Sequence, residues 1–93
     1  MSGAPFKTTW YFDNRAKRAH PEARREDWVQ HVLDHPVERR PDRIHSRTRL
    51  YGYIRERRRY MRVVIDDTEG AVHNAFFDSD YKPGWRRRRE AKP

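Results

Sequence analysis

Five residues near the middle of this sequence combine positive charge and aromatic rings at spacings that suit a nucleic acid. Arg49, Tyr51 and Tyr53 alternate along one segment, and Tyr60 and Arg62 alternate along the next. Arginine pairs with phosphate oxygens through a planar fork of N–H donors, and tyrosine stacks on bases or donates to phosphate. The alternative is an ordinary half-solvated sheet face, where both residue types are common.

A histidine further along can do acid–base chemistry, because its ring titrates near neutral pH. A metal-independent ribonuclease needs a base for the 2′-hydroxyl, a cation beside the phosphorane and an acid for the leaving oxygen. We predict that these catalytic roles belong to His73, Arg62, Arg49 and Tyr51. The alternative is a structural histidine bonded across a hairpin, with Asn74 satisfying a backbone group.

Further contacts to nucleic acid are predicted from polar, basic and aromatic residues: Tyr53, Tyr60, Asn74, Lys82, Arg86, Arg87, Arg88 and Arg89. The four consecutive arginines suit phosphate but cannot read bases. The same run would equally suit a solvated tail or docking onto an acidic partner protein.

The other histidines give weak support for metal binding. His31 and His35 have the spacing of a metal-ligand pair on a helix, but no cysteine helps them and Pro36 follows at once. His20 could reach the sheet edge as a second acid/base group, although its place beside Pro21 favours a surface helix end. Glycine-rich phosphate loops are missing. We therefore expect neither a metal nor a cofactor.

The charge balance of the chain also favours an anionic partner. The 93 residues include 22 basic and 14 acidic side chains, for a net charge of +8, and 18 of the basic residues are arginine. Residues 1–36 hold 6 basic and 5 acidic groups, whereas residues 37–93 hold 16 and 9. The basic surface is therefore expected in the second half. A GC-rich coding genome would also raise arginine over lysine.

The composition excludes several classes of protein. There is no cysteine, so disulfides and cysteine-bound zinc are excluded. No apolar run of about 18 residues is present, which argues against a membrane span. The first ten residues lack the pattern of a secretory signal, so we expect a cytoplasmic protein.

The N-terminal third is expected to supply two helices. Residues 8–12 are rich in β-formers and could be a first strand, after which Asp13 or Asn14 caps a short helix that ends near Pro21. A second helix follows, with its apolar stripe formed by Trp28, Val29, Val32 and Leu33 and its end at His35-Pro36.

After Pro36 the apolar period changes from 3.6 to 2, which predicts strands over residues 39–44, 47–55, 59–65 and 71–77. In the last strand, Val72, Asn74 and Phe76 should face one way and Ala71, His73, Ala75 and Phe77 the other. We expect an α+β domain over residues 1–82, with the helices on one face of three to four antiparallel strands. Residues 83–93 are expected to form a flexible basic tail.

Several stretches resemble a group of small uncharacterised bacterial proteins. They are Asp42-Arg43-Ile44, Leu50-Tyr51-Gly52-Tyr53-Ile54, Tyr60-Met61-Arg62-Val63-Val64 and Val72-His73-Asn74-Ala75-Phe76-Phe77-Asp78. This pattern is similar to the DUF4258 and BrnT-like proteins of the RelE/ParE toxin superfamily, and it spans about residues 8–82.

The resemblance implies a RelE-like fold, with two short helices against a curved antiparallel sheet. It also implies a toxin of a toxin–antitoxin pair, often a ribonuclease acting on RNA such as mRNA on the ribosome, with an acidic antitoxin as partner. The active groups it points to are Arg49, Tyr51, Arg62 and His73. Some members of the superfamily inhibit DNA gyrase and cut nothing, so a non-catalytic binder and a protein-interaction module stay as alternatives.

Overall fold

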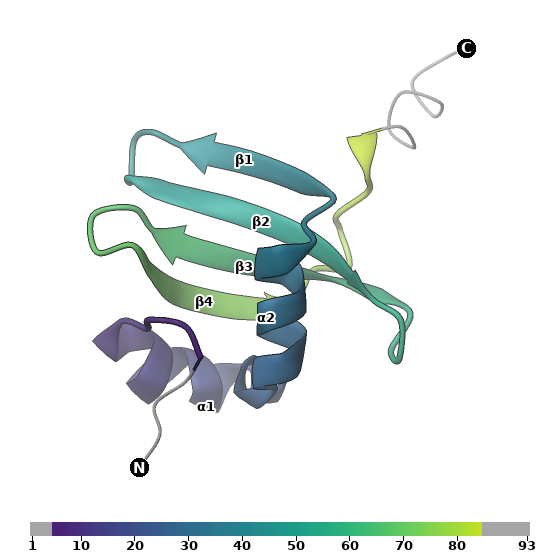
Figure 1. Ribbon diagram of the computed structural model, residues 1–93, viewed down its shortest axis with the longest axis horizontal. Coiled ribbons are helices and arrows are strands. Elements are labelled where there is room, and N and C mark those ends of the chain that lie inside the picture. Colours follow the sequence, from purple (N-terminus) through teal and green to yellow (C-terminus); the bar gives the residue numbers. More distant parts are fainter. Residues whose placement is uncertain (1–4, 85–93) are drawn as a thin grey trace.

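The chain forms a four-stranded antiparallel sheet preceded by helical segments (Figure 1). The computed structural model describes residues 5–84. The strands lie side by side in sequence order: β1 (Glu38–Asp42), β2 (Arg47–Ile54), β3 (Arg59–Asp66) and β4 (Ala71–Phe77). The expected α+β class is confirmed, and the helices precede the sheet as predicted.

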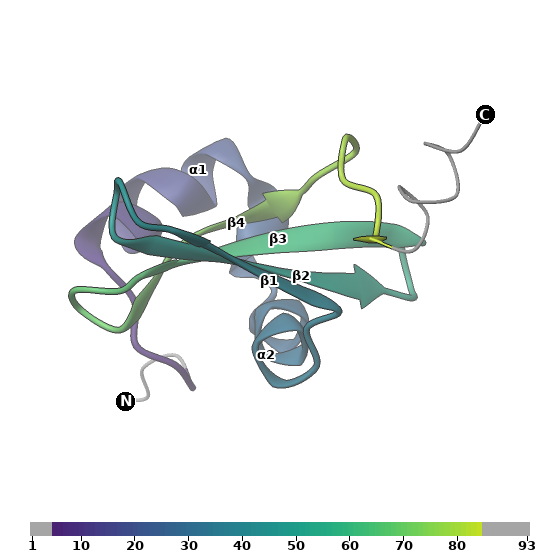
Figure 2. The same cartoon turned by 90° about the horizontal axis from the view of Figure 1, so that it is seen from above.

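Helix α2 (Glu26–Asp34) packs across one face of the sheet (Figure 2). Three of the four residues of its predicted apolar stripe are buried: Trp28 is 5% exposed, Val29 and Val32 are fully covered, and Leu33 is partly buried against them. The three buried side chains share one core cluster with sheet residues Leu50, Ile54, Met61, Val63 and Ala75. Burial of this stripe, more than intrinsic helix propensity, stabilises a helix of only nine residues.

Gly52 lets α2 approach β2 closely. A Cβ atom at this position would lie 2.9 Å from Cγ2 of Val32 and 3.1 Å from its Cα. Because side chains alternate along a strand, Leu50 and Ile54 face α2 with Gly52, while Tyr51 and its neighbours two residues away face the opposite side. We call that opposite side the open face.

The first helical segment covers an edge of the sheet instead of its face. Its turns are η1 (Phe12–Ala16), α1 (Lys17–Ala19) and η2 (Pro21–Arg24), and they lie alongside β4 (Figure 1). Before them the chain makes one parallel bridge to β4, in which the Thr9 N–H donates to the Val72 carbonyl at 3.0 Å. The unpaired backbone groups of this edge are therefore partly satisfied.

The strand predicted over residues 8–12 is wrong. Only Thr8 pairs with the sheet, and the backbone is already helical at Trp10. The helix begins there because the hydroxyl of Thr9 accepts the N–H of Phe12 at 3.1 Å, as an N-cap does. Capping by Asp13 or Asn14 was therefore also a wrong prediction.

A bulge interrupts the pairing of β3 with β4. Val64 pairs with Asn74 and Ile65 pairs with Val72, so His73 is an extra residue on β4. Simple alternation had grouped Val72 with Asn74 and His73 with Ala75. Both assignments are wrong, because the extra residue of a bulge reverses which face of the sheet the residues before it point to. Val72 joins the core, and His73 is only half-buried.

Strand β1 forms the other edge of the sheet. It has five residues, among which are two arginines and Pro41, and it pairs with β2 from Glu38 opposite Tyr51 to Asp42 opposite Arg47. Proline cannot donate to a strand ladder, which is why it is confined to sheet edges and bulges. The strand predicted over residues 39–44 is confirmed, and it spans Glu38–Asp42.

The described chain continues for several residues beyond β4. Pro83 is buried, so the packed part of the protein extends at least that far. The predicted phosphate contacts of Arg86, Arg87, Arg88 and Arg89 lie outside the described residues. Among residues 5–84, no helix is both long enough and apolar enough to cross a membrane.

Candidate nucleic-acid interface

The open face gathers the basic and aromatic residues that the sequence predicted would lie together. In the strand register, Tyr51 pairs with Arg62 and Tyr53 pairs with Tyr60. Arg49 stands two residues before Tyr51 on the same side of β2. The prediction that these five side chains share one face is confirmed, and it is the face opposite α2.

Two adjoining hollows cross this face, and we call them together the cationic groove. The larger, of about 350 Å³, is lined by Asp42, His45, Arg47, Arg49, Arg62, Val64, His73, Asn74 and Phe76. The smaller, of about 240 Å³, is lined by Arg40, Arg49, Tyr51, Arg62, Asp78, Asp80, Tyr81 and Lys82. Arg49 and Arg62 belong to both hollows, so the two positive side chains stand at their junction.

His73 borders the groove because of the bulge in β4. Its Nδ1 lies 3.1 Å from Oγ1 of Thr9, and its ring stacks on Tyr11 with a centroid distance of 4.6 Å. Burial lowers the pKa of His73, and the positive charge of Arg47 lowers it further. The lowered pKa favours the neutral imidazole. When Nδ1 carries the proton and donates to Thr9, Nε2 is left as a base.

Arg62 is fixed in place by a carboxylate. Its Nε and Nη2 donate to Oδ2 of Asp78 at 3.1 and 2.6 Å, and only 26% of its side chain is exposed. The guanidinium carbon also lies 5.6 Å from the ring centre of Tyr51 and 5.0 Å from that of Phe76. Asp78 thus offsets much of the charge that Arg62 would offer to a phosphate.

Arg49 is held more loosely than Arg62. Its nearest carboxylate oxygen is on Asp42 at 3.9 Å, the long limit of an ion pair, and 40% of the side chain is exposed. Arg47 stands two residues earlier on the same strand and lines the same hollow. Sequence reasoning missed Arg47, although its parity with Arg49 was visible. Arg40 was missed as well, since its position opposite Arg49 depends on the register of β1.

Tyr51 was predicted to contact a substrate, but its side chain is buried. Its ring is only 1% exposed, because Tyr81 stacks flat on it with a centroid distance of 4.0 Å and an interplanar angle of 9°. The Tyr81 hydroxyl donates to Oε1 of Glu38 at 2.6 Å. The predicted catalytic contact of Tyr51 with a substrate therefore requires Tyr81 to move.

Tyr53 and Tyr60 lie at the other end of the open face, beyond Tyr81. Their rings contact each other at 5.1 Å, and Tyr60 meets the edge of Tyr81 at 5.2 Å. Both tyrosines border a further hollow of about 480 Å³ that also includes Arg58 and Arg59 and that shares Asp78 and Tyr81 with the smaller hollow of the groove. These two predicted binding residues can therefore serve a strand of nucleic acid that leaves the cationic groove.

Asn74 and Lys82, the remaining predicted binding residues within the described chain, both line the groove. Oδ1 of Asn74 accepts the N–H of Ala75 at 2.9 Å, which agrees with the alternative that this amide satisfies a backbone group. His20, which could act as a second acid/base group, stacks on Phe76 at 5.0 Å. Phe76 lines the larger hollow, so His20 reaches the rim of the groove.

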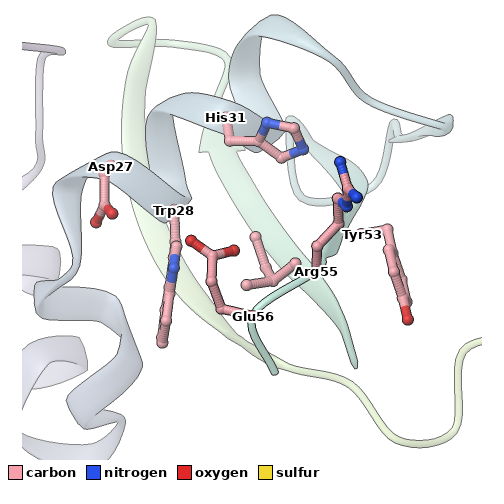
Figure 3. A pocket seen from close by; sticks show the side chains of 7 residues that line it. Asp27, Trp28, His31, Tyr53, Arg55 and Glu56 are labelled. Carbon is pink, nitrogen blue, oxygen red and sulfur yellow. The ribbon is translucent and has the colours of Figure 1, made fainter. Parts of the chain in front are cut away.

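A third cleft, on the α2 side of the molecule, has mixed charge. Figure 3 shows Trp28 and His31 from the helix, Tyr53 from the end of β2, and Arg55 and Glu56 from the turn after it, around a cavity of about 700 Å³. Its lining has two carboxylates and one arginine, whereas the cationic groove has four arginines and one lysine against three carboxylates, so the groove is better suited to phosphate. Nε1 of Trp28 has no hydrogen-bond partner. Within residues 5–84, no group of three or more potential metal ligands is assembled.

Comparison with known proteins gives no match: no family model, no curated protein and no solved structure is similar to this chain. The chemistry of the cationic groove is therefore the basis for a proposed function.

Proposed function

We propose that this chain is a cytoplasmic, toxin-like protein whose cationic groove binds RNA and whose His73 takes part in metal-independent cleavage of that RNA. The observation that carries the proposal is that His73 lines the same hollow as Arg47, Arg49 and Arg62. The resemblance to BrnT-like and RelE-like proteins supports a place in a bacterial toxin–antitoxin pair, with an acidic antitoxin as the protein partner.

The groove offers the groups that cleavage by the 2′-hydroxyl needs. Neutral His73 accepts the 2′ proton, the 2′ oxygen bonds to phosphorus, and the bond from phosphorus to the 5′ oxygen breaks. Arg47 and Arg49 neutralise the two nonbridging oxygens of the phosphorane. The leaving 5′ oxygen takes a proton from water or from His45, which lines the same hollow.

A non-catalytic binding role is the second candidate, and the pairing of Arg62 with Asp78 favours it. A cation held by a carboxylate at 2.6 Å is less able to stabilise a developing phosphorane. On this alternative the groove only binds, as in a nucleic-acid-binding or gyrase-inhibitor-type accessory protein.

Binding is tested with a fluorescent single-stranded RNA whose anisotropy is followed from 50 to 200 mM salt. Arg47→Ala and Arg49→Ala should each lower the slope of log K against log salt by about 1, because each removes one phosphate contact. The charge-matched control replaces Arg18 and Arg55, which are exposed and outside the groove. If Arg18→Ala and Arg55→Ala weaken binding as much as Arg47→Ala and Arg49→Ala do, the RNA has no preferred place on the protein.

Cleavage is tested in the presence of a chelator, with growth of a bacterial host under induced expression as a second readout. His73→Ala should lower the cleavage rate by about 10²–10⁴-fold and relieve toxicity while the RNA affinity stays nearly unchanged. His31→Ala, on the exposed side of α2, is the matched control. Binding without cleavage by the wild-type protein would support the accessory role and discard the catalytic one.

A further inference from the structure

The chain places an acidic and aromatic turn on its own cationic face. This turn, Asp78–Tyr81, follows β4 directly, and Figure 2 shows the chain after β4 on the side of the sheet opposite α2. At the start of the turn, the N–H of Asp78 donates a hydrogen bond to the carbonyl of Tyr60 on β3 at 3.0 Å. Within the turn, Oδ1 of Asp78 accepts the N–H of Asp80 at 3.0 Å. The turn is thus internally braced.

Two side chains of the turn contact the groove in the way that a nucleotide would. The Tyr81 ring lies flat on Tyr51 at 4.0 Å and 9°, a geometry typical of a base stacked on an aromatic side chain. The Asp78 carboxylate accepts two N–H donors from Arg62, as a phosphate oxygen would. Arg40 stands beside both stacked rings, 5.4 Å from the centre of Tyr51 and 5.6 Å from that of Tyr81.

We propose that Tyr51, Arg62 and Arg40 form a nucleotide subsite for one base and its adjoining phosphate, and that the turn Asp78–Tyr81 occupies this subsite until single-stranded RNA displaces it. This inference rests on the proposed function, since it assumes that the groove binds RNA. It explains why an aromatic ring on the open face is almost fully buried. A base can replace the stacking of Tyr81, and a phosphate can replace the carboxylate of Asp78.

The contacts that hold the turn are of a kind that an anion can exchange. Arg62 is the main ionic partner of Asp78, and Glu38 accepts both the Tyr81 hydroxyl and Nε of Arg40, the latter at 2.7 Å. Displacement by RNA would release the carboxylate of Asp78 to solvent and give Arg62 a phosphodiester, which carries the same single negative charge and has two oxygens that can accept the N–H donors of Arg62. The turn therefore acts as a competitive inhibitor built into the chain.

The test uses the full chain and a 2′-O-methyl oligouridylate of twelve nucleotides, which can bind but cannot be cleaved. Tyr81→Ala should bind it about tenfold tighter than the wild type, because the base no longer competes with a ring for Tyr51. Tyr51→Leu in the Tyr81→Ala background should abolish that gain. Tyr53→Ala, which removes an exposed tyrosine of the same face, should give no gain.

Two further measurements make the outcome specific. An abasic oligonucleotide of the same length should show no gain with Tyr81→Ala, since the subsite needs a base to stack. Asp78→Asn keeps the shape of the turn and removes the negative charge that faces Arg62, so it should also tighten RNA binding. If thermal unfolding shows that Tyr81→Ala is not folded, Asp78→Asn takes its place in the test.

The results separate this inference from the proposed function. If the wild type binds through Arg47 and Arg49 but neither turn variant binds more tightly, the subsite is refuted and RNA binding stands. If the turn variants bind and the wild type does not, the result supports a subsite that the turn fully blocks in the wild-type protein. If no variant binds even at 50 mM salt, both proposals fall.

Discussion

The ring of His73 stacks on the ring of Tyr11 at 4.6 Å, with the two planes only 16° apart. His73 comes from the bulge in β4, and Tyr11 comes from the first helical turn, 62 residues earlier in the chain. Thr9, two residues before Tyr11, touches Nδ1 of the same imidazole. The N-terminal segment therefore orients the side chain to which we assign the acid–base chemistry.

The titration of His73 should be displaced to lower pH. Burial is the main cause of its lowered pKa, and the charge of Arg47 is the second. We expect an NMR titration of the His73 ring to have its midpoint below 6.5, and Arg47→Ala to move that midpoint upward. Arg55→Ala, outside the hollow, should leave it unchanged. A wild-type midpoint above 6.5 would mean that Asp66 and Glu69, which raise this pKa, dominate.

The same shift makes the stability of the fold depend on pH. Because the folded state resists protonation of His73, the unfolded chain binds more protons between the folded pKa and about 6.5. The contribution of His73 to stability is complete above pH 6.5 and is lost as the pH falls through the folded pKa. His73→Gln should flatten this part of a plot of unfolding free energy against pH, measured by urea denaturation. An unaltered plot would contradict the assigned shift.

Trp28 should be essential for stability, and Trp10 should not. Trp28 is 5% exposed and packs against Phe77 at 5.6 Å, whereas Trp10 is 67% exposed. Trp28→Ala should lower the free energy of unfolding by about 3–5 kcal/mol, enough to unfold a domain of this size. Trp10→Ala should change it by no more than about 0.5 kcal/mol. A cooperatively folded Trp28→Ala variant would refute the packing of α2 described above.

Gly52→Ala should destabilise the protein by pushing α2 away from β2. The added methyl group would lie 2.9 Å from Cγ2 of Val32, and overpacking of this kind costs about 1–3 kcal/mol. Val32→Ala removes the closest atom, so the double variant should be less destabilised than the sum of the two single variants. Strict additivity in thermal unfolding would show that the two residues do not touch. Gly70→Ala, where no atom lies within 4 Å, is strained only through its positive φ of 65°.

Thr9 should contribute both to the helix start and to the placement of His73. Its hydroxyl caps the Phe12 N–H and touches the imidazole. Thr9→Val should cost about 0.5–2 kcal/mol of stability, the usual range for a lost N-cap, whereas Thr9→Ser should keep it. If Thr9→Val also lowers cleavage of RNA more than its effect on folding explains, the contact with His73 has a functional role. Equal activity of both variants would leave Thr9 with a structural role alone.

Much of this fold follows from short-range patterns, and the remainder depends on distant contacts. The stripe through Trp28 and the alternation along β2 specify a helix and a strand locally, and both predictions are confirmed. The bulge at His73 depends on how β4 meets β3, and the burial of Tyr51 depends on Tyr81, thirty residues later. Neither is encoded in the periodicity of its own segment.

The N-terminal segment shows a third reason why prediction fails. Residues 8–12 have high β-propensity, but the side chain of Thr9 satisfies the first free N–H groups of a helix, and Phe12 is buried in that helix. Capping and burial together outweigh intrinsic preference. Arg47 was missed for a simpler reason, since its parity was readable but its proximity to His73 required the bulge.

The two edges of the sheet bear on whether a second chain can add a strand to it. One edge is occupied by the bridge from Thr8 to Val72, and the other ends in a five-residue strand with Pro41 and two arginines. A second chain would find little room to add a strand at either side, and like charges would repel it. Association through β-strand exchange is thus disfavoured, which directs any partner of the described domain toward its faces.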